Sequence, residues 1–332
     1  MKAIQAFFAN GVGYDGEYRR TTNRLGAALL CFLGLFTLGD AVALPALERF
    51  WEGVLPYRVV DVAVELTDAL LYFLSFVIPV MLYAILTPRS QRVVLPLAPR
   101  LPKRLGLLLP AGLSVIYCAA AVNAFMTRHM GLAPSQSVVW RSEVTLWQGL
   151  LMFLVTALIP AFCEELLFRG LIFSELLPYG RTIALVASAV LFGLMHQNPR
   201  QFLYTTVAGL VLGWLVLESG SLWAAVLLHM MNNTISVIGE ILPRQLPTRE
   251  AEQLFAIVEV LLIGSGLLCL VCYLLRYSSP SALGRESCLP DGQQSSIRPV
   301  RSFFSPLMSG FVLLAAGQML LLVAVRWGLR LL

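Results

Sequence analysis

Two glutamates and an arginine stand within a strongly apolar stretch, FCEELLFRGLIF, which covers residues 162–173. Ionisable side chains in membrane-like segments are costly, and by default they indicate a functional site. Glu165 and Arg169 are four residues apart with the glutamate first, which is the favoured order for an ion pair within one helix. Glu164 is rotated about 100° from Glu165 around a helix. The spacing therefore assigns Arg169 to Glu165 and leaves Glu164 for chemistry.

Two more polar pairs follow at the same four-residue spacing, Phe192 and His196 in FGLMH and His229 and Asn233 in HMMNN. Residues four apart lie on one face of a helix. A carboxylate, two imidazoles and an amide in one interior are enough to activate water and to hold an oxyanion. In this hypothesis Glu164 takes a proton from water that His196 helps to orient. His229 and Asn233 donate hydrogen bonds to the substrate carbonyl oxygen as it becomes an alkoxide.

Each of these features has a structural interpretation too. A buried Glu–Arg pair, a histidine on an apolar face and an asparagine at a helix bend are each commoner as packing features than as catalysts. Their combination favours a site, because two of the three histidines in the chain fall in these motifs, downstream of the paired glutamates. The third histidine, His129, receives no role.

The order and spacing of the three motifs, EExxxR at Glu164–Arg169, FxxxH at Phe192–His196 and HxxxN at His229–Asn233, resemble the signature of a known family. This is the CPBP family of intramembrane proteases, which includes the CAAX prenyl endopeptidases and bacteriocin-processing or bacteriocin-immunity proteins. The resemblance covers roughly residues 144–239, under a third of the chain. It implies an all-helical bundle with its site inside the membrane, and peptide-bond hydrolysis in a membrane-associated protein or peptide.

The resemblance also implies residue roles. Glu164 corresponds to the catalytic glutamate and His196 to the histidine that orients the water, whereas His229 and Asn233 correspond to the oxyanion site. Three further residues are expected to support the structure, namely Glu165, Arg169 and Phe192.

Zinc is an alternative to metal-free catalysis, because one carboxylate and two imidazoles, those of Glu164, His196 and His229, could bind it with an open fourth position. The helix with two histidines one turn apart, HExxH, is absent from the sequence, and a carboxylate with hydrogen-bond donors suffices for general-base hydrolysis. The sequence therefore favours catalysis without a cofactor and leaves zinc as the alternative.

The rest of the chain must place these residues in a membrane. Of its 332 residues 58% are hydrophobic and only 13% are charged, against roughly 25% charged in a soluble domain. Apolar runs of about 17–25 residues predict transmembrane helices, and their continuity excludes the alternating pattern of barrel strands. We expect eight or nine spans, at Leu25–Ala43, Val62–Leu86, Leu105–Phe125, Val144–Phe162, Ile183–Met195, Phe202–Leu217, Leu222–Ile238, Leu254–Leu275 and Pro306–Val325.

Four segments follow from this pattern. Residues 1–24 form a cytoplasmic N-terminal segment, and residues 25–276 form a membrane-embedded domain whose protease-like core lies at 144–239. Residues 277–301, rich in Ser, Gly, Gln and Pro, predict a flexible loop, and residues 302–332 carry the final transmembrane helix. A different loop, residues 89–104, carries five basic residues, which place it in the cytoplasm. The expected location is the plasma membrane of a bacterium.

The depth of the three motifs is the difficulty. At 1.5 Å per residue, simple counting does not bring Glu164, His196 and His229 to one level. Either the helix of residues 183–196 does not cross the bilayer fully, or the helix through Glu164 is long and tilted.

Two other functions are open. A non-catalytic family member that binds or shields a membrane partner, as an immunity protein does, would use the same motifs for folding. A transporter or proton relay would use Glu65, Asp68 and Glu259 with the histidines, but the paired broken helices typical of transporters are not found. The net charge of +5 is explained by orientation and by contact with the lipid bilayer, and no basic stripe with aromatics indicates nucleic acid.

Overall fold

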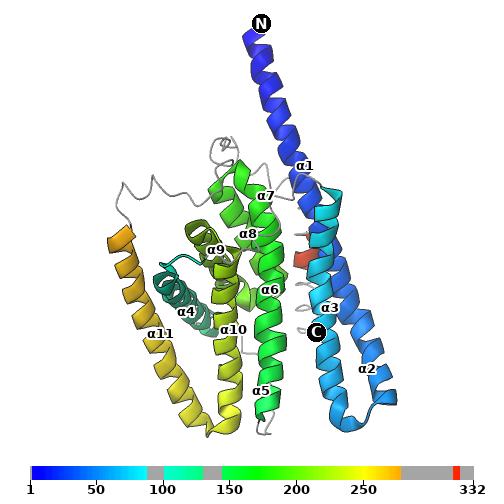
Figure 1. Cartoon of the computed structure of the whole chain (residues 1–332), viewed down its shortest axis with the longest axis vertical. Helices are drawn as coiled ribbons and strands as arrows, with labels where there is room; N and C mark the ends of the chain where they lie inside the picture. Colours follow the sequence, from blue (N-terminus) through cyan, green and yellow to red (C-terminus); the bar gives the residue numbers. More distant parts are fainter. Residues whose placement is uncertain (1, 88–100, 130–143, 278–316, 322–332) are drawn as a thin grey trace. The chain divides into compact units, whose positions relative to one another are not determined.

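A computed structural model describes residues 2–87, 101–129, 144–277 and 317–321. Every regular element in these ranges is a helix, as predicted (Figure 1). Within this described part of the chain, seven helices are long and apolar enough to cross a membrane, and one further apolar helix is shorter. The chain is thus a polytopic helical membrane protein. The expected loop 277–301 and the final span Pro306–Val325 lie almost wholly outside the described residues.

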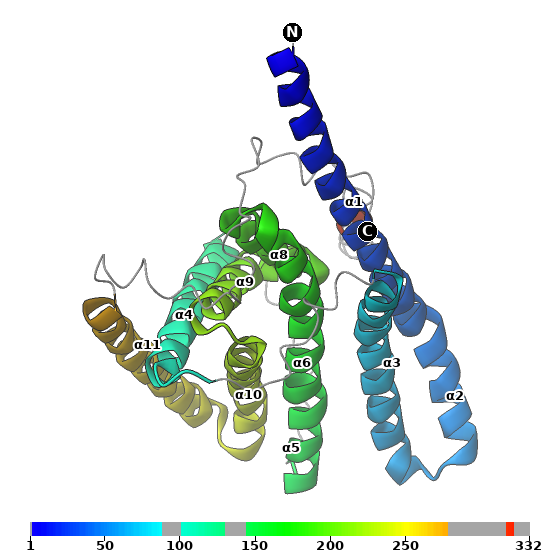
Figure 2. The same cartoon turned by 45° about the horizontal axis from the view of Figure 1, so that its top comes forward.

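The described helices fall into two compact units. The first unit includes α1 (Lys2–Leu38), which continues through the π-helical segment η1 (Gly39–Ala43) into α2 (Leu44–Val54), and α3 (Tyr57–Leu86). In Figure 2, α1 and α2 lie along α3. Their contact is aromatic, because the rings of Phe32 and Phe76 are 4.5 Å apart between centroids. Helix α1 begins well before Leu25, where the first apolar span was predicted.

The second unit contains Pro96–Arg169 and Ser188–Gln294. It is built on α4 (Leu105–His129), α9 (Pro199–Ser219), α10 (Leu222–Gln245) and α11 (Thr248–Tyr277), which pack against one another. Their shared core is apolar and includes Leu108, Ile116, Leu215, Ala224 and Leu228. Small residues allow close packing, since a Cβ atom at Gly209 of α9 would come within 2.9 Å of the Ala189 Cα atom.

One long helical segment, residues Leu146–Tyr179, carries the two glutamates. It consists of α5 (Leu146–Met152), η3 (Phe153–Leu158), α6 (Ile159–Glu165), η4 (Leu166–Phe173), α7 (Ser174–Leu176) and η5 (Leu177–Tyr179), in which η3 and η4 are π-helical and η5 is 3₁₀. Thr145 and Gln148 form a capping box at its start. The glutamates lie at the end of α6, between the two π-helical segments. Such insertions are frequent at functional sites.

The lengths of two helices bear on the depth of the three motifs in the membrane. The segment Leu146–Tyr179 has 34 residues, roughly 50 Å at 1.5 Å per residue, which exceeds a bilayer core of about 30 Å. Helix α8 (Arg181–Met195) has only 15 residues, roughly 22 Å. The segment through Glu164 is therefore long, as one alternative requires, and α8 before His196 is shorter than a bilayer core, as the other requires.

Helix α8 ends sharply next to His196. Gln197 has a positive φ of 49°. This angle lies outside the right-handed helical region and is uncommon for residues other than glycine, so the helix ends here. Asn198 then caps α9, accepting a hydrogen bond from the Arg200 amide at 3.0 Å, and Pro199 starts the helix. This short connection holds His196 at the end of α8.

Candidate active site

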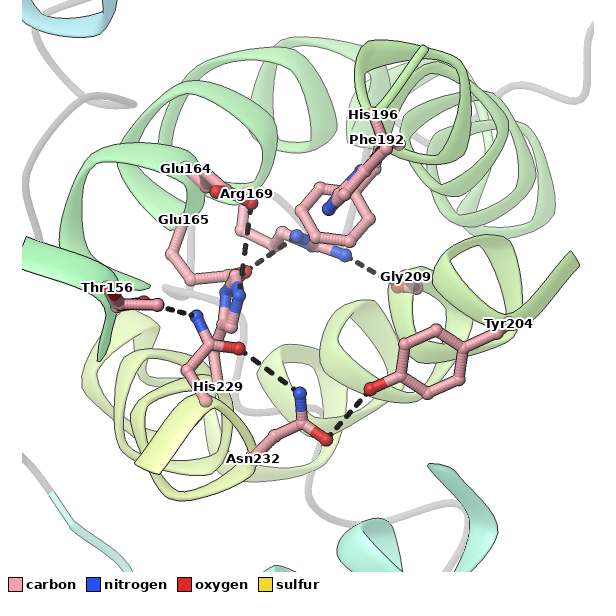
Figure 3. Close-up of polar contacts among 11 residues, drawn as sticks. Thr156, Glu164, Glu165, Arg169, Phe192, His196, Tyr204, Gly209, His229 and Asn232 are labelled. Carbon is pink, nitrogen blue, oxygen red and sulfur yellow. Dashed lines mark hydrogen bonds and ion pairs between the residues drawn. The ribbon is translucent and has the colours of Figure 1, made fainter. Parts of the chain in front are cut away.

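Side chains from three helical segments of the second unit form one polar cluster beside a cavity (Figure 3). Helix α6 supplies Glu164 and Glu165, the end of α8 supplies Phe192 and His196, and α10 supplies His229. The structure therefore brings elements more than 60 residues apart in sequence into contact.

Glu165 is the centre of this arrangement. Its Oε1 atom accepts hydrogen bonds from Arg169 Nη1 at 2.7 Å and from His229 Nδ1 at 2.9 Å. Neither Glu165 nor Arg169 has any exposed side-chain surface. The ion pair expected from the four-residue spacing is therefore present, but the contact of Glu165 with His229 was not anticipated. It depends on the packing of α6 against α10, which the spacing within a single motif does not reveal.

Glu164 lies on the other side of His229. Its Oε2 atom is 3.8 Å from His229 Nε2, and the residue is only 5% exposed. The imidazole of His229 thus has one glutamate at each ring nitrogen. A carboxylate oxygen therefore lies where it can accept from either ring nitrogen that carries a hydrogen.

Phe192 separates the polar groups. Its ring lies 4.5 Å from Arg169 Cζ, which is within range of a cation–π contact. The same ring is 5.0 Å from the His196 ring and 5.7 Å from the His229 ring. Arg169 also donates to the Gly209 carbonyl oxygen at 2.9 Å. Phe192 therefore covers the buried guanidinium and stands next to both imidazoles.

The orientation of His196 follows from its hydrogen bond. Its Nδ1 atom is 2.9 Å from the Phe192 carbonyl oxygen, and since a carbonyl only accepts, Nδ1 carries the hydrogen. In the neutral ring Nε2 is then an acceptor. The chain holds a second FxxxH, Phe125–His129, in which His129 Nδ1 is 2.8 Å from the Phe125 carbonyl oxygen. The local geometry comes from the spacing itself, and only the surroundings distinguish the two histidines.

Those surroundings are a cavity of about 300 Å³. Glu164 is not among the residues that line it, but its Oε2 atom is 3.8 Å from Nε2 of His229, which does line it. The lining residues are Ile116, Thr156, Phe192, His196, Gln201, Tyr204, Thr205, Ala208, Leu212, His229, Asn232, Asn233 and Ser236.

Asn233 is held by residues that the motifs did not indicate. Its Nδ2 atom donates to the Thr156 carbonyl oxygen at 3.3 Å, and its Oδ1 atom accepts from Asn232 Nδ2 at 3.2 Å. Tyr204 in turn donates to Asn232 Oδ1 at 3.0 Å. The doubled asparagine in HMMNN was the only sequence signal for Asn232, and nothing in the sequence pointed to Tyr204 or Thr156.

Zinc held by Glu164, His196 and His229 stays the alternative to metal-free catalysis. Among the described residues, no three His, Cys, Asp or Glu side chains are grouped as a metal site requires. His229 Nδ1 is hydrogen-bonded to Glu165, which leaves Nε2 as the ring nitrogen that a metal ion would use.

Comparisons with known proteins point to the same segment. Residues 145–235 match the family model "Type II CAAX prenyl endopeptidase Rce1-like". A protein of Bacillus subtilis (strain 168) named "Putative membrane peptidase YdiL" is 31% identical over 96 residues, which are 28% of this chain and 38% of the relative. The comparison with solved structures gave no significant match. The resemblance predicted from the three motifs is confirmed: residues 145–235, which supply most of the cavity lining, are similar to the Rce1-like CAAX prenyl endopeptidases.

Proposed function

We propose that this chain is an intramembrane endopeptidase that hydrolyses a peptide bond in a membrane-associated protein or peptide. The observation that carries the proposal is the cavity of about 300 Å³, lined by His196, His229 and Asn233, with Glu164 next to His229. The family resemblance over residues 145–235 supports the reaction class. The bacterial origin of the relative supports a bacterial plasma membrane as the location.

Glu164 is the proposed general base. It takes a proton from a water molecule, and the hydroxide attacks the carbonyl carbon of the scissile bond. His196 orients that water, because its Nε2 atom accepts a hydrogen bond while Nδ1 is held by the Phe192 carbonyl. The proton then passes from Glu164 to the leaving nitrogen, the C–N bond breaks, and a carboxylic acid and an amine are released.

His229 and Asn233 are the proposed donors to the oxyanion. Because His229 Nδ1 is engaged by Glu165 at 2.9 Å, the proposed donor to the oxyanion is the other ring nitrogen, Nε2. The Glu165 carboxylate fixes the orientation of the ring. Asn233 adds a neutral N–H, whose loss in Asn233→Ala should lower turnover roughly a hundredfold with little effect on folding. Unchanged turnover would remove Asn233 from the oxyanion site.

The test is a cleavage assay in which a second glutamate, outside the cavity, serves as the control. Purified protein in nanodiscs is incubated with a library of peptides and membrane proteins, and new peptide termini are detected by mass spectrometry. Wild type is compared with Glu164→Gln and with Glu259→Gln, which changes a glutamate on α11 that lies outside the cavity. Each protein is assayed with and without a chelator.

We expect cleavage that resists the chelator, persists in Glu259→Gln and disappears in Glu164→Gln. Chelator-sensitive cleavage would support zinc instead. Cleavage that survives Glu164→Gln would refute the assignment of the base. If folded wild type cleaves nothing, the non-catalytic binding or immunity function gains support.

A further inference from the structure

A directed chain of hydrogen bonds crosses the cavity wall from one helix to another (Figure 3). It starts at Tyr204 on α9, passes through Asn232 and Asn233 on α10, and ends at the Thr156 carbonyl oxygen in η3. All four residues line the cavity. Asn232 and Asn233 are neighbours in sequence, about 100° apart around the helix, so one faces α9 while the other faces η3.

The last member of the chain fixes the direction of every bond. A backbone carbonyl can only accept, so the atom of Asn233 that faces Thr156 must be the amino nitrogen. Asn233 Oδ1 then faces Asn232, which must offer its own amino nitrogen. Asn232 Oδ1 is left to accept, and the Tyr204 hydroxyl supplies the donor. Reversing any one amide would place two donors or two acceptors face to face.

We propose that Tyr204 and Asn232 are positioning residues that hold the Asn233 amide with its N–H, not its oxygen, toward the reacting carbonyl. The inference rests on the proposed function, in which Asn233 donates to the oxyanion. One Asn233 amino hydrogen is used by Thr156, and the second is available to the cavity. A rotated amide would present Oδ1 instead and would repel the developing negative charge.

The burial of Asn232 makes this arrangement stringent. Asn232 is only 8% exposed, and buried amide groups are almost always hydrogen-bonded, because an unsatisfied one is costly. Asn233 is more accessible, and its side chain is hydrogen-bonded to Asn232 and to the Thr156 carbonyl. Asn233 therefore depends on its neighbour for its orientation, and Asn232 depends on Tyr204.

Two substitutions interrupt this chain of hydrogen bonds while nearly preserving the size of the side chains. Tyr204→Phe removes the donor at its start. Asn232→Asp keeps the size of the side chain but replaces the amino group by oxygen, which opposes the Asn233 oxygen. The matched control is Tyr273→Phe, because Tyr273 on α11 donates in the same way to Glu218 Oε2, at 2.5 Å, outside the cavity.

The first measurement does not require activity. The chain has six asparagines, so protein labelled with ¹⁵N only in asparagine gives few side-chain amide signals. Each pair of signals is assigned by replacing one asparagine and observing which pair disappears. We expect Tyr204→Phe and Asn232→Asp to shift the Asn233 amide signals and to speed their hydrogen exchange, and Tyr273→Phe to leave them unchanged. If both substitutions leave the Asn233 amide signals and their hydrogen exchange unchanged, the proposal is overturned, whether or not the protein cleaves peptides.

The second measurement uses a peptide cleaved by the wild type. Loss of one net hydrogen bond predicts that Tyr204→Phe lowers kcat roughly three- to tenfold, with KM within about twofold, and Asn232→Asp lowers it further. In an Asn233→Ala background neither change should reduce kcat again, since residues that act through one group are not additive. Equal losses in both backgrounds would reduce Tyr204 and Asn232 to a structural role. A wild type without cleavage would refute the proposed function alone, and the amide signals would still decide the positioning.

Discussion

The buried pair of Glu165 and Arg169 allows a quantitative test of the packing argument. Both side chains are fully buried and Arg169 Nη1 lies 2.7 Å from Glu165 Oε1. Glu165→Gln removes the carboxylate next to the buried guanidinium, which still contacts the Gly209 carbonyl and the Phe192 ring. Arg169→Met keeps much of the volume but removes the cation next to the Glu165 carboxylate, which still accepts a hydrogen bond from His229.

The expected free energies follow from this geometry. Removing one partner of a buried ion pair costs about 3–5 kcal/mol, whereas replacing both by neutral groups of similar size is often far less damaging. Each single variant should therefore lose about 3 kcal/mol or more of unfolding free energy. The double variant Glu165→Gln/Arg169→Met should lose at least about 2 kcal/mol less than the sum, which is a strong coupling for neighbouring residues.

The assay is equilibrium unfolding in mixed micelles with a rising fraction of SDS, followed by helical circular dichroism. A second cycle serves as the control, combining Arg169→Met with Glu218→Gln, whose carboxylate contacts Tyr273; it should be additive within about 0.5 kcal/mol. Additivity in the Glu165 and Arg169 cycle would refute the ion pair as a stabilising element. Arg169→Met should also lower folded yield more than specific activity, and the reverse would place Arg169 in the site.

Three further predictions follow from single contacts. His196→Ala should lower cleavage at least about tenfold in the peptide assay. The control His129→Ala breaks the same kind of Nδ1 contact to a carbonyl, on an exposed helix end, and should leave cleavage unchanged. Equal losses in the two variants would contradict the water-orienting role of His196. Gly209→Ala should sharply reduce folded yield, measured by size-exclusion chromatography, because its Cβ would meet the Ala189 backbone at 2.9 Å. Gln197→Gly should preserve or raise the midpoint of thermal unfolding, since φ 49° suits glycine, and a clear fall would show that the Gln197 side chain stabilises the connection.

The sequence predicted what depends on composition and on spacing within a helix. Long apolar runs identified the transmembrane helices, and the four-residue spacing of Glu165 and Arg169 identified their ion pair. The spacing could not predict what depends on which helices pack together. The bond from Glu165 to His229, the contact of Phe192 with Arg169, and the link from Tyr204 to Asn232 all join different elements. The π-helical segments on either side of α6 were not predicted from the sequence either.

The contact between Glu165 and His229 explains why the motif needs two adjacent glutamates. Neighbouring residues in a helix point about 100° apart, so one carboxylate can reach Arg169 on its own helix and His229 on α10, while the other faces the opposite nitrogen of the same imidazole. A single glutamate could not neutralise the arginine, hold the ring and remain available to take a proton from water. Under the proposed mechanism, Glu165 supplies the fixed negative charge that keeps His229 a donor, and Glu164 is left to change its protonation state. The cost of burying three charged groups in an apolar helix is then met by this division of roles.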